Sequence, residues 1–365
     1  MAYRLTRRQF GELARRDLGR PGVTAARVTV FAMSVLLLVA VLGLAAAGVW
    51  LITYDFPAFT ILPGAVLVLS AIVIRPRFGR LSPLLETVSR AEAPTLHALL
   101  DRVAFASGAP PPHVVAVDKG FNAYAWAVGL RRRRVLCIGL GLWATLPPQQ
   151  RVALLGHELG HFANGDVRRG LLTQPAYTTL AAVAGLLSPT PQAPTAFDLG
   201  GLATTAAQLF QWVLSRVLLT AHVALLAVGL RDTQRAEYLA DDMAATAAGS
   251  DAVAGLLDCL LMVEQIKVVV STSARNGAVG PAWVGPAQRA RDNLADRLPL
   301  LRQLSVRDDV SLFASHPPAG LRARMVEARG SRPPAVSLTE GESAAIDAEM
   351  TRQYERARRD LAWSG

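Results

Sequence analysis

The sequence has few cysteines, few aromatic residues and little charge. Cys137 and Cys259 are the two cysteines among 365 residues, and they lie far apart without a CxxC or CxxH spacing. This pattern favours reduced, structural thiols over a disulfide framework. Aromatic residues make up 6% of the chain and do not alternate with its basic residues. The net charge of +10 is therefore not arranged as in a nucleic-acid-binding protein, and we expect no nucleic-acid partner.

Charged residues make up 18% of the chain, whereas hydrophobic residues make up 52%. Such a composition is unusual for a soluble protein, so part of the apolar content must face lipid. Residues 28–52 form an uncharged apolar run that is long enough, at about 1.5 Å per residue, to cross a hydrocarbon core of about 30 Å. A second run at 56–74 follows closely, which predicts a transmembrane hairpin over 28–74. The first run is longer than the core of a signal peptide, so we expect it to be retained.

Arginines on both sides of this hairpin predict its orientation. The short connection between the two runs contains no Lys or Arg. Because cytoplasmic flanks carry an excess of positive charge, both ends of the hairpin are expected on the cytoplasmic side. The flanking arginines are Arg4, Arg7, Arg8, Arg15, Arg16, Arg20 and Arg27 before the hairpin and Arg75, Arg77 and Arg80 after it.

A second apolar stretch at residues 171–230 is interrupted near its middle by a proline-rich loop that also lacks Lys and Arg. We interpret it as another out-and-back hairpin, which gives about four transmembrane helices in total. Within this stretch, Arg216 is interpreted as a side chain that reaches the interface or pairs with Asp198. His222 is interpreted as a neutral, packed side chain, so neither residue is assigned a function.

Local patterns outside the hairpins predict a small mixed α and β domain. Apolar residues at helical spacing predict a helix over residues 83–107. Three β-type runs follow at 113–117, 123–128 and 135–138. Four arginines between the last two runs are interpreted as a solvated hairpin tip, and contact with anionic headgroups is the weaker alternative. The stretch at 340–362 reads as a charged amphipathic helix or a partly ordered tail.

The residues that carry chemistry lie in a predicted helix that begins at Pro147-Pro148. His157 and His161 are four positions apart, so their imidazoles share one helical face and can bind one metal ion. Zinc accepts neutral histidine nitrogens and leaves a position open for water in catalytic sites. Glu158 would then be the general base that takes a proton from this water. An HExxH motif arises by chance in such a composition with a probability of roughly a few in a thousand.

A catalytic zinc site needs a third protein ligand. The segment 234–241 offers Glu237 and Asp241 one helical turn apart. Glu237 is a candidate ligand, and Asp241 is a candidate hydrogen-bond partner that orients an imidazole. From spacing alone, an ordinary solvated acidic face explains the two carboxylates equally well.

Three separated motifs resemble those of the HtpX-like membrane metalloproteases and, more distantly, of the CAAX prenyl proteases. They are HELGH at 157–161, RAEYLAD at 235–241 and SHPPAGLR at 315–322, in that order, with hairpins before and between them. The resemblance covers residues 83–330. The roles that it implies are zinc binding by His157, His161 and Glu237, with one ion per chain, general-base catalysis by Glu158, and orientation of a ligand by Asp241.

The resemblance also implies roles beyond the zinc ligands. His316 would stabilise the oxyanion with support from Arg322, because a cationic donor at that position lowers the barrier. The segment 121–124 is similar to the edge strand that binds substrate in the family. Asn122 and Ala123 would therefore hold an extended substrate through backbone hydrogen bonds, and a plain edge strand is the alternative. Gly156 departs from the family, in which Ala often occupies this position.

Together, these observations predict a mainly α membrane protein with about four transmembrane helices and a zincin-type α+β catalytic domain that contains a small sheet. The expected function is that of a zinc metalloendopeptidase that hydrolyses peptide bonds in membrane or misfolded proteins. We expect it to be embedded in the lipid of a bacterial inner or plasma membrane, with its catalytic domain in the cytoplasm. The predicted segments are a basic N-terminal arm (1–27), two transmembrane hairpins (28–74 and 171–230), two parts of one catalytic domain (80–170 and 231–330) and a charged helical tail (331–365).

Two alternatives share the zinc site. A catalytically silent zinc-binding scaffold is disfavoured by the intact Glu158, and by a ligand set that leaves a position open for water. A CAAX-type prenyl protease is disfavoured by the predicted number of spans. A transporter would need paired repeats, and the sequence has no internal repeat.

Overall fold

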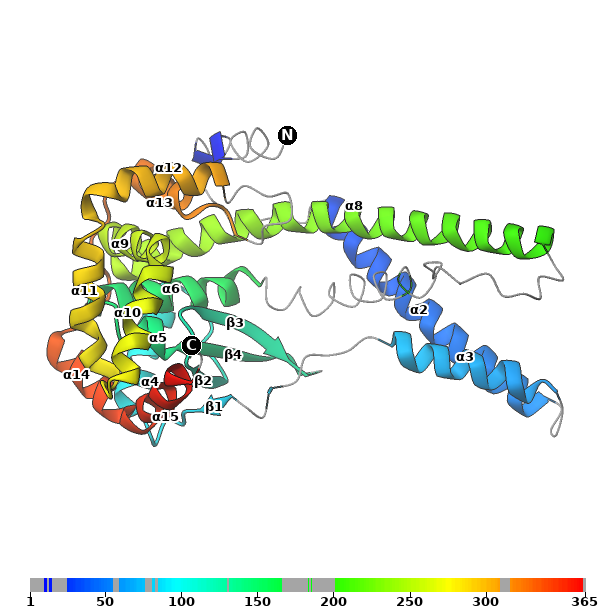
Figure 1. The fold of residues 1–365 in the computed structure, drawn as a ribbon, viewed down its shortest axis with the longest axis horizontal. Coiled ribbons are helices and arrows are strands. Elements are labelled where there is room, and N and C mark those ends of the chain that lie inside the picture. The colour runs from blue at the N-terminus through cyan, green and yellow to red at the C-terminus, as the bar shows by residue number, and fades with distance from the viewer. Residues whose placement is uncertain are drawn as a thin grey trace. The chain divides into compact units, whose positions relative to one another are not determined.

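The computed structural model describes residues 10, 11, 13, 14, 25–54, 59–75, 81, 82, 85–129, 131–165, 183, 185, 201–308 and 316–363. The chain divides into two compact units (Figure 1). One unit contains residues 22–78 and 169–231, and the other contains residues 1–21, 79–168 and 232–365. The long helix α8 (Gly201–Ala248) contributes residues to both units. The first of these units is mainly apolar helix, and the second contains every residue of the predicted zinc site.

The apolar unit contains a helical hairpin of α2 (Ala25–Tyr54) and α3 (Ile61–Ile74). The two helices touch backbone to backbone at Gly48 and Gly64, where a Cβ atom added to Gly48 would lie 2.8 Å from the carbonyl oxygen of Gly64. Most large apolar side chains of the hairpin are exposed, including Leu36, Leu42 and Leu62. The hairpin therefore packs through its glycines and presents its apolar side chains outward.

The number of membrane spans is not confirmed. Among the described residues, Val28–Tyr54 is long and apolar enough to cross a membrane, whereas α3 has 14 residues and is classed as a shorter apolar helix. At about 1.5 Å per residue α3 covers about 21 Å of a hydrocarbon core of about 30 Å. Most of the first half of the second predicted hairpin, at 171–200, lies outside the described residues.

The second unit, which contains residues 1–21, 79–168 and 232–365, has a four-stranded mixed sheet in the order β1-β2-β4-β3. Its strands are β1 (Glu86–Thr87), β2 (Val114–Asp118), β3 (Ala123–Val128) and β4 (Arg133–Gly139). Strand β2 runs parallel to β4, and β3 runs antiparallel to β4 at the edge of the sheet. The three predicted β runs are confirmed, and Arg133 and Arg134 of the predicted hairpin tip belong to β4.

The helix predicted over residues 83–107 is too long at its beginning. The observed helix α4 spans Pro94–Ala106, and Glu86 and Thr87 pair with β2 instead. A turn separates the two elements, because the carboxylate of Glu92 accepts hydrogen bonds from the backbone N–H and the hydroxyl of Ser89. Pro94 then begins the helix, where its missing N–H costs nothing. Apolar residues at helical spacing therefore extend into a segment that forms a strand and a turn. Pairing with β2 stabilises the strand.

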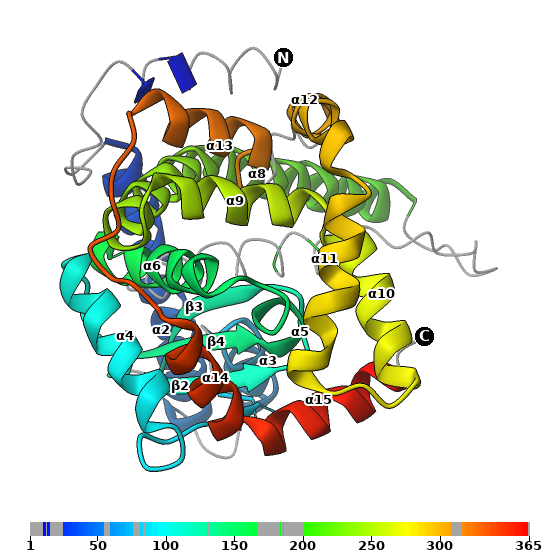
Figure 2. The same cartoon turned by 90° about the vertical axis from the view of Figure 1, so that its left-hand side faces the viewer.

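The HExxH helix α6 (Pro148–Asn164) lies between the sheet on one side and α8 and α9 (Ser250–Leu261) on the other (Figure 2). Val152, Leu155 and Leu159 of α6 are fully buried in the main hydrophobic core together with Leu136 and Ile138 of β4. The remaining helices surround this centre: α5 (Leu140–Trp143), α10 (Val263–Arg275), α11 (Val284–Asp292), α12 (Leu298–Asp308), α13 (Ala319–Ala328), α14 (Glu340–Glu349) and α15 (Thr351–Ala362).

The C-terminal helices α14 and α15 are part of the core of the second unit. Asp347 of α14 accepts a hydrogen bond of 2.9 Å from Nη1 of Arg151, which lies on α6 and is buried. The Arg151 guanidinium also stacks 5.0 Å from the ring centroid of Trp143. Glu349 accepts hydrogen bonds from the backbone N–H groups of Thr95 and Leu96, which start α4. The last segment of the chain therefore fixes both α4 and the HExxH helix.

The buried pair of Arg151 and Asp347 gives a test of this arrangement. Replacing Asp347 with Asn leaves the Arg151 charge in a buried site without its counter-ion, which we expect to lower the free energy of unfolding by about 3 kcal/mol. Denaturant or thermal unfolding of the detergent-solubilised protein measures the loss. Glu355→Gln is the matched control, because the Glu355 side chain is 45% exposed and its ion pair with Arg358 lies at the surface. Equal stability of the two variants would contradict the structural role of α14.

Candidate metal centre

Residues at both ends of α6 define the helix on which His157 and His161 lie four positions apart, on one face. Pro147 and Pro148 lead into the helix, and Gly165 ends it in the left-handed conformation at φ 71°. The Gly165 N–H bonds the carbonyl group of Phe162, so the helix stops one turn after the motif. His157 is buried, with 7% of the residue exposed, and its imidazole contacts that of His161 with ring centroids 4.9 Å apart.

Close packing of α6 against α8 brings the third group to these histidines. A Cβ atom added to Gly156 would lie 2.9 Å from Cα of Ala244, and one added to Gly160 would lie 2.9 Å from Cα of Ala240. Both approaches are shorter than real Cβ contacts, so a larger residue on α6 would push the helices apart. Glu237 lies one turn before Ala240 on α8, and this proximity directs its carboxylate at the imidazoles.

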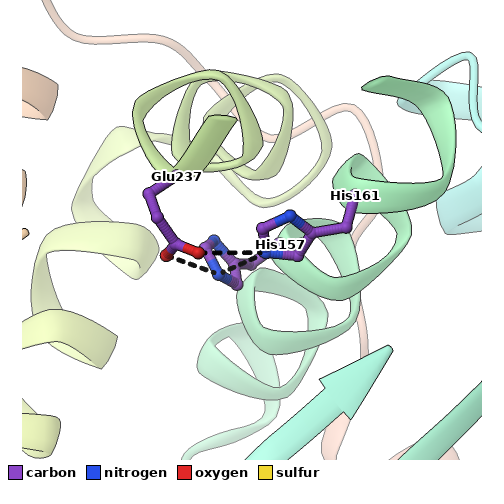
Figure 3. Close-up of side chains that lie close together, drawn as sticks. All are labelled: His157, His161 and Glu237. Atoms are coloured by element: carbon purple, nitrogen blue, oxygen red, sulfur yellow. Dashed lines mark hydrogen bonds and ion pairs between the residues drawn. The ribbon is translucent and has the colours of Figure 1, made fainter. Parts of the chain in front are cut away.

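Three metal-binding side chains converge between the two helices (Figure 3). Nε2 of His157 and Nε2 of His161 are 3.3 Å apart; the first lies 3.5 Å from Oε2 of Glu237, and the second lies 3.5 Å from Oε1 of the same carboxylate. A tetrahedral zinc ion with bonds of about 2.0–2.1 Å separates its ligand atoms by about 3.3–3.4 Å. Two imidazoles and one carboxylate also match the donor set of catalytic zinc sites. The residues present therefore fit a zinc ion in both spacing and chemistry.

Asp241 fixes the orientation of His157. Its Oδ1 lies 3.0 Å from Nδ1 of His157, so Nε2 of the same ring is left for the metal. Arg322 bonds both carboxylate oxygens of Asp241, at 2.8 Å from Nε and 2.7 Å from Nη2. Burial opposes ionisation of Asp241, but the Arg322 guanidinium and the His157 contact lower its pKa to about 2. Asp241 therefore stays ionised behind the imidazole, with its charge balanced by Arg322.

His316 and Arg322 both reach Glu237. Nδ1 of His316 lies 2.8 Å from Oε2 of Glu237, and Nη1 of Arg322 lies 3.4 Å from the same oxygen. Burial opposes ionisation of Glu237, but His316, Arg322 and the two ligand histidines hold its pKa well below the ordinary value. The His316 side chain is 61% exposed, whereas that of Arg322 is 8% exposed. His316 therefore combines contact with the site and access to solvent.

The other predicted site residues lie in the same unit. Glu158 follows His157 on α6 and is 6% exposed. Asn122 and Ala123 lie at the start of the edge strand β3, and the Asn122 carbonyl accepts a hydrogen bond from the Gly139 N–H. Strand β3 lies next to α6 in both views (Figures 1 and 2). Arg216 and His222 lie on the part of α8 that belongs to the apolar unit, where the Arg216 guanidinium stacks 5.5 Å from the Trp212 ring centroid.

Sequence reasoning missed two features of the site. It connected Arg322 with the oxyanion, whereas its shortest bonds go to Asp241. It also noted Gly156 only as a departure from the family, and it gave Gly160 no role. The GxxxG spacing on α6, opposite an AxxxA spacing at Ala240 and Ala244, is the signal that could have predicted a close helix crossing.

Comparison with known proteins agrees with this geometry. The family model of Peptidase family M48 matches residues 90–330. A protease HtpX homolog of Acidiphilium cryptum is 27% identical over 246 residues, which cover 67% of this chain and 76% of the relative. A protease HtpX homolog of Methanothermobacter thermautotrophicus is 33% identical over 112 residues, which cover 30% of this chain and 43% of the relative. Protease HtpX homolog 1 of Streptomyces coelicolor is 37% identical over 101 residues, or 27% of this chain and 32% of the relative. No solved structure matches the chain.

The helix contact itself can be tested through metal binding. Gly160→Ala places a methyl group 2.9 Å from the α8 backbone, so we expect overpacking to weaken zinc binding by about 1–3 kcal/mol, or roughly 5- to 150-fold. Competition with a chromophoric chelator measures the affinity. Gly341→Ala is the control, because a Cβ atom at this position of α14 meets no atom within 4 Å. Unchanged zinc affinity in Gly160→Ala would show that the crossing does not determine the site.

Proposed function

The chain belongs to peptidase family M48, a family of metalloproteases, and from this premise we propose that it is a zinc endopeptidase acting on polypeptides at a membrane. The observation that supports it most strongly is the set of donor distances among His157, His161 and Glu237, with Glu158 next to the first ligand in sequence. His157, His161 and Glu237 would hold the zinc ion, which would supply Lewis-acid chemistry by lowering the pKa of a water molecule to about 7 and polarising the scissile carbonyl group.

In this proposal, each of the other side chains around the metal has a separate role in catalysis. Glu158 accepts the proton of the attacking water and returns it to the leaving amine, which is general acid–base catalysis by one carboxylate. Asp241 keeps Nδ1 of His157 hydrogen-bonded, and Arg322 holds Asp241 in place. His316, exposed at the same site, supplies the donor that stabilises the oxyanion.

The substrate lies along the edge strand β3 in this proposal. An extended polypeptide adds to the sheet through backbone hydrogen bonds to Ala123, and the exposed side chain of Asn122 helps to position it beside α6. Recognition through the backbone accepts many sequences, as removal of membrane or misfolded proteins requires. We place the catalytic parts (80–170 and 231–330) in the cytoplasm and the hairpins (28–74 and 171–230) in the inner or plasma membrane of a bacterial cell. The basic arm (1–27) precedes the first hairpin, and the helical segment at 331–365 packs against the catalytic parts through α14 and α15.

Removing the general base tests the proposal. Glu158→Gln keeps the shape of the side chain and all three ligands, so we expect bound zinc to remain and the rate of casein cleavage to fall about 10²–10⁴-fold. Cleavage by the detergent-solubilised, zinc-loaded protein is followed together with zinc content. Glu264→Gln on α10 is the matched control, since this side chain is 76% exposed. A wild-type protein that binds zinc but cleaves neither casein nor membrane-protein fragments would instead support the silent scaffold.

A further inference from the structure

The edge strand β3 presents its backbone in a defined pattern. The Gly139 N–H donates to the Asn122 carbonyl at 2.9 Å, and the register pairs Ala123 with Ile138. In an antiparallel ladder, alternate residues point both backbone groups at the partner strand. Tyr124 and Trp126 therefore bond to β4, whereas the N–H and C=O groups of Ala123, Ala125 and Ala127 point away from it. These three alanines offer the free edge to an incoming strand.

The side chains of β3 also alternate between two faces. Ala123 and Ala125 pack against the hydrophobic core that includes Leu155 and Leu159 of α6. Tyr124 and Trp126 lie on the opposite face, where their rings stack with centroids 5.0 Å apart and planes at 27°. Both aromatic side chains are partly exposed. The inner face of β3 is therefore lined by methyl groups, and the outer face by a pair of aromatic rings.

The aromatic pair is held in place. The Tyr124 hydroxyl donates a hydrogen bond of 3.0 Å to Oδ2 of Asp118, and Oδ1 of Asp118 accepts one of 2.7 Å from the Gly120 N–H. Across the sheet, Tyr124 faces Cys137 and Trp126 faces Val135, which are fully buried. A surface of this kind is ordered before any substrate arrives, so a contact with it costs little conformational entropy.

We propose that Tyr124 and Trp126 form two substrate subsites that select polypeptide segments with aromatic or β-branched side chains at alternate positions, i and i+2. The inference rests on the proposed function and deepens it. A strand that pairs with β3 places every second side chain on the outer face, directly beside these rings, and aromatic–aromatic and aromatic–β-branched pairs are the favourable neighbours there. Such alternation is typical of strands that a folded protein buries. The subsites therefore favour segments that become accessible on unfolding.

Cleavage of designed peptides by the full-length, zinc-loaded protein in detergent tests the inference. An N-methyl scan of one host peptide first identifies the residues whose N–H groups bond the enzyme, which should recur with a period of two. Tyr and Val are then placed at i and i+2, in the positions between the bonded residues, and compared with Ser at both positions. We expect kcat/KM to be about 3- to 10-fold higher for the Tyr and Val peptide, as two favourable cross-strand pairs imply. The same pair moved by one residue should bring no gain.

Variants assign the preference to the rings. Trp126→Thr keeps a strand-forming residue but removes one ring, so most of the preference should disappear, whereas Trp126→Phe should retain it. Trp363→Thr is the matched control, because Trp363 lies at the end of α15 and is 88% exposed. Zinc content and the unfolding midpoint are measured for each variant.

If Trp126→Thr is unstable, cleavage of the designed peptides by the wild-type protein is sufficient to test the two subsites. Equal kcat/KM for the Tyr and Val peptide and the Ser peptide, or an equal gain at both registers, would overturn the subsites while leaving the protease intact. A preference that survives in a stable Trp126→Thr variant would also overturn them. Failure to cleave any peptide would instead contradict the proposed function.

Discussion

The structure of the site depends on how closely α6 and α8 approach each other. Two glycines on α6 face two alanines on α8, and the backbones come near enough for side chains of the two helices to share one metal ion. Larger residues at this contact would push the helices apart and weaken the binding of a shared zinc ion. The rest of the catalytic unit, including the sheet and the C-terminal helices, packs around α6 and keeps this crossing fixed.

The close crossing creates an electrostatic requirement. Glu237 and Asp241 are both less than 3% exposed, and two carboxylates so near each other would repel strongly in a dry interior. Arg322 is buried with them and contacts both, which balances one of the two negative charges. The remaining negative charge faces the imidazoles of the two histidines, a combination that favours a divalent cation. Charge balance and ligand geometry thus support the same ion.

The local features of this site follow from sequence, and the long-range ones do not. His157 and His161 share a face because of helical periodicity alone, and the strand at 123–128 is visible from its alternation. Glu237 is distant in sequence, so spacing left it equivalent to a solvated carboxylate, and the resemblance to a family was needed to choose it. The bond between Arg322 and Asp241 connects residues that only the fold brings together. The beginning of α4 at Pro94 was missed for a similar reason, because pairing of Glu86 and Thr87 with β2 overrides the local apolar spacing.

X-ray absorption at the zinc edge of the zinc-loaded, full-length protein shows directly which atoms hold the ion. We predict nitrogen and oxygen neighbours at about 2.0–2.1 Å, multiple scattering from two imidazoles and no sulfur. Loss of one imidazole in His161→Ala should change that spectrum. A zinc–sulfur distance of about 2.3 Å, or a spectrum unaffected by removal of His161, would show that the ion is held elsewhere.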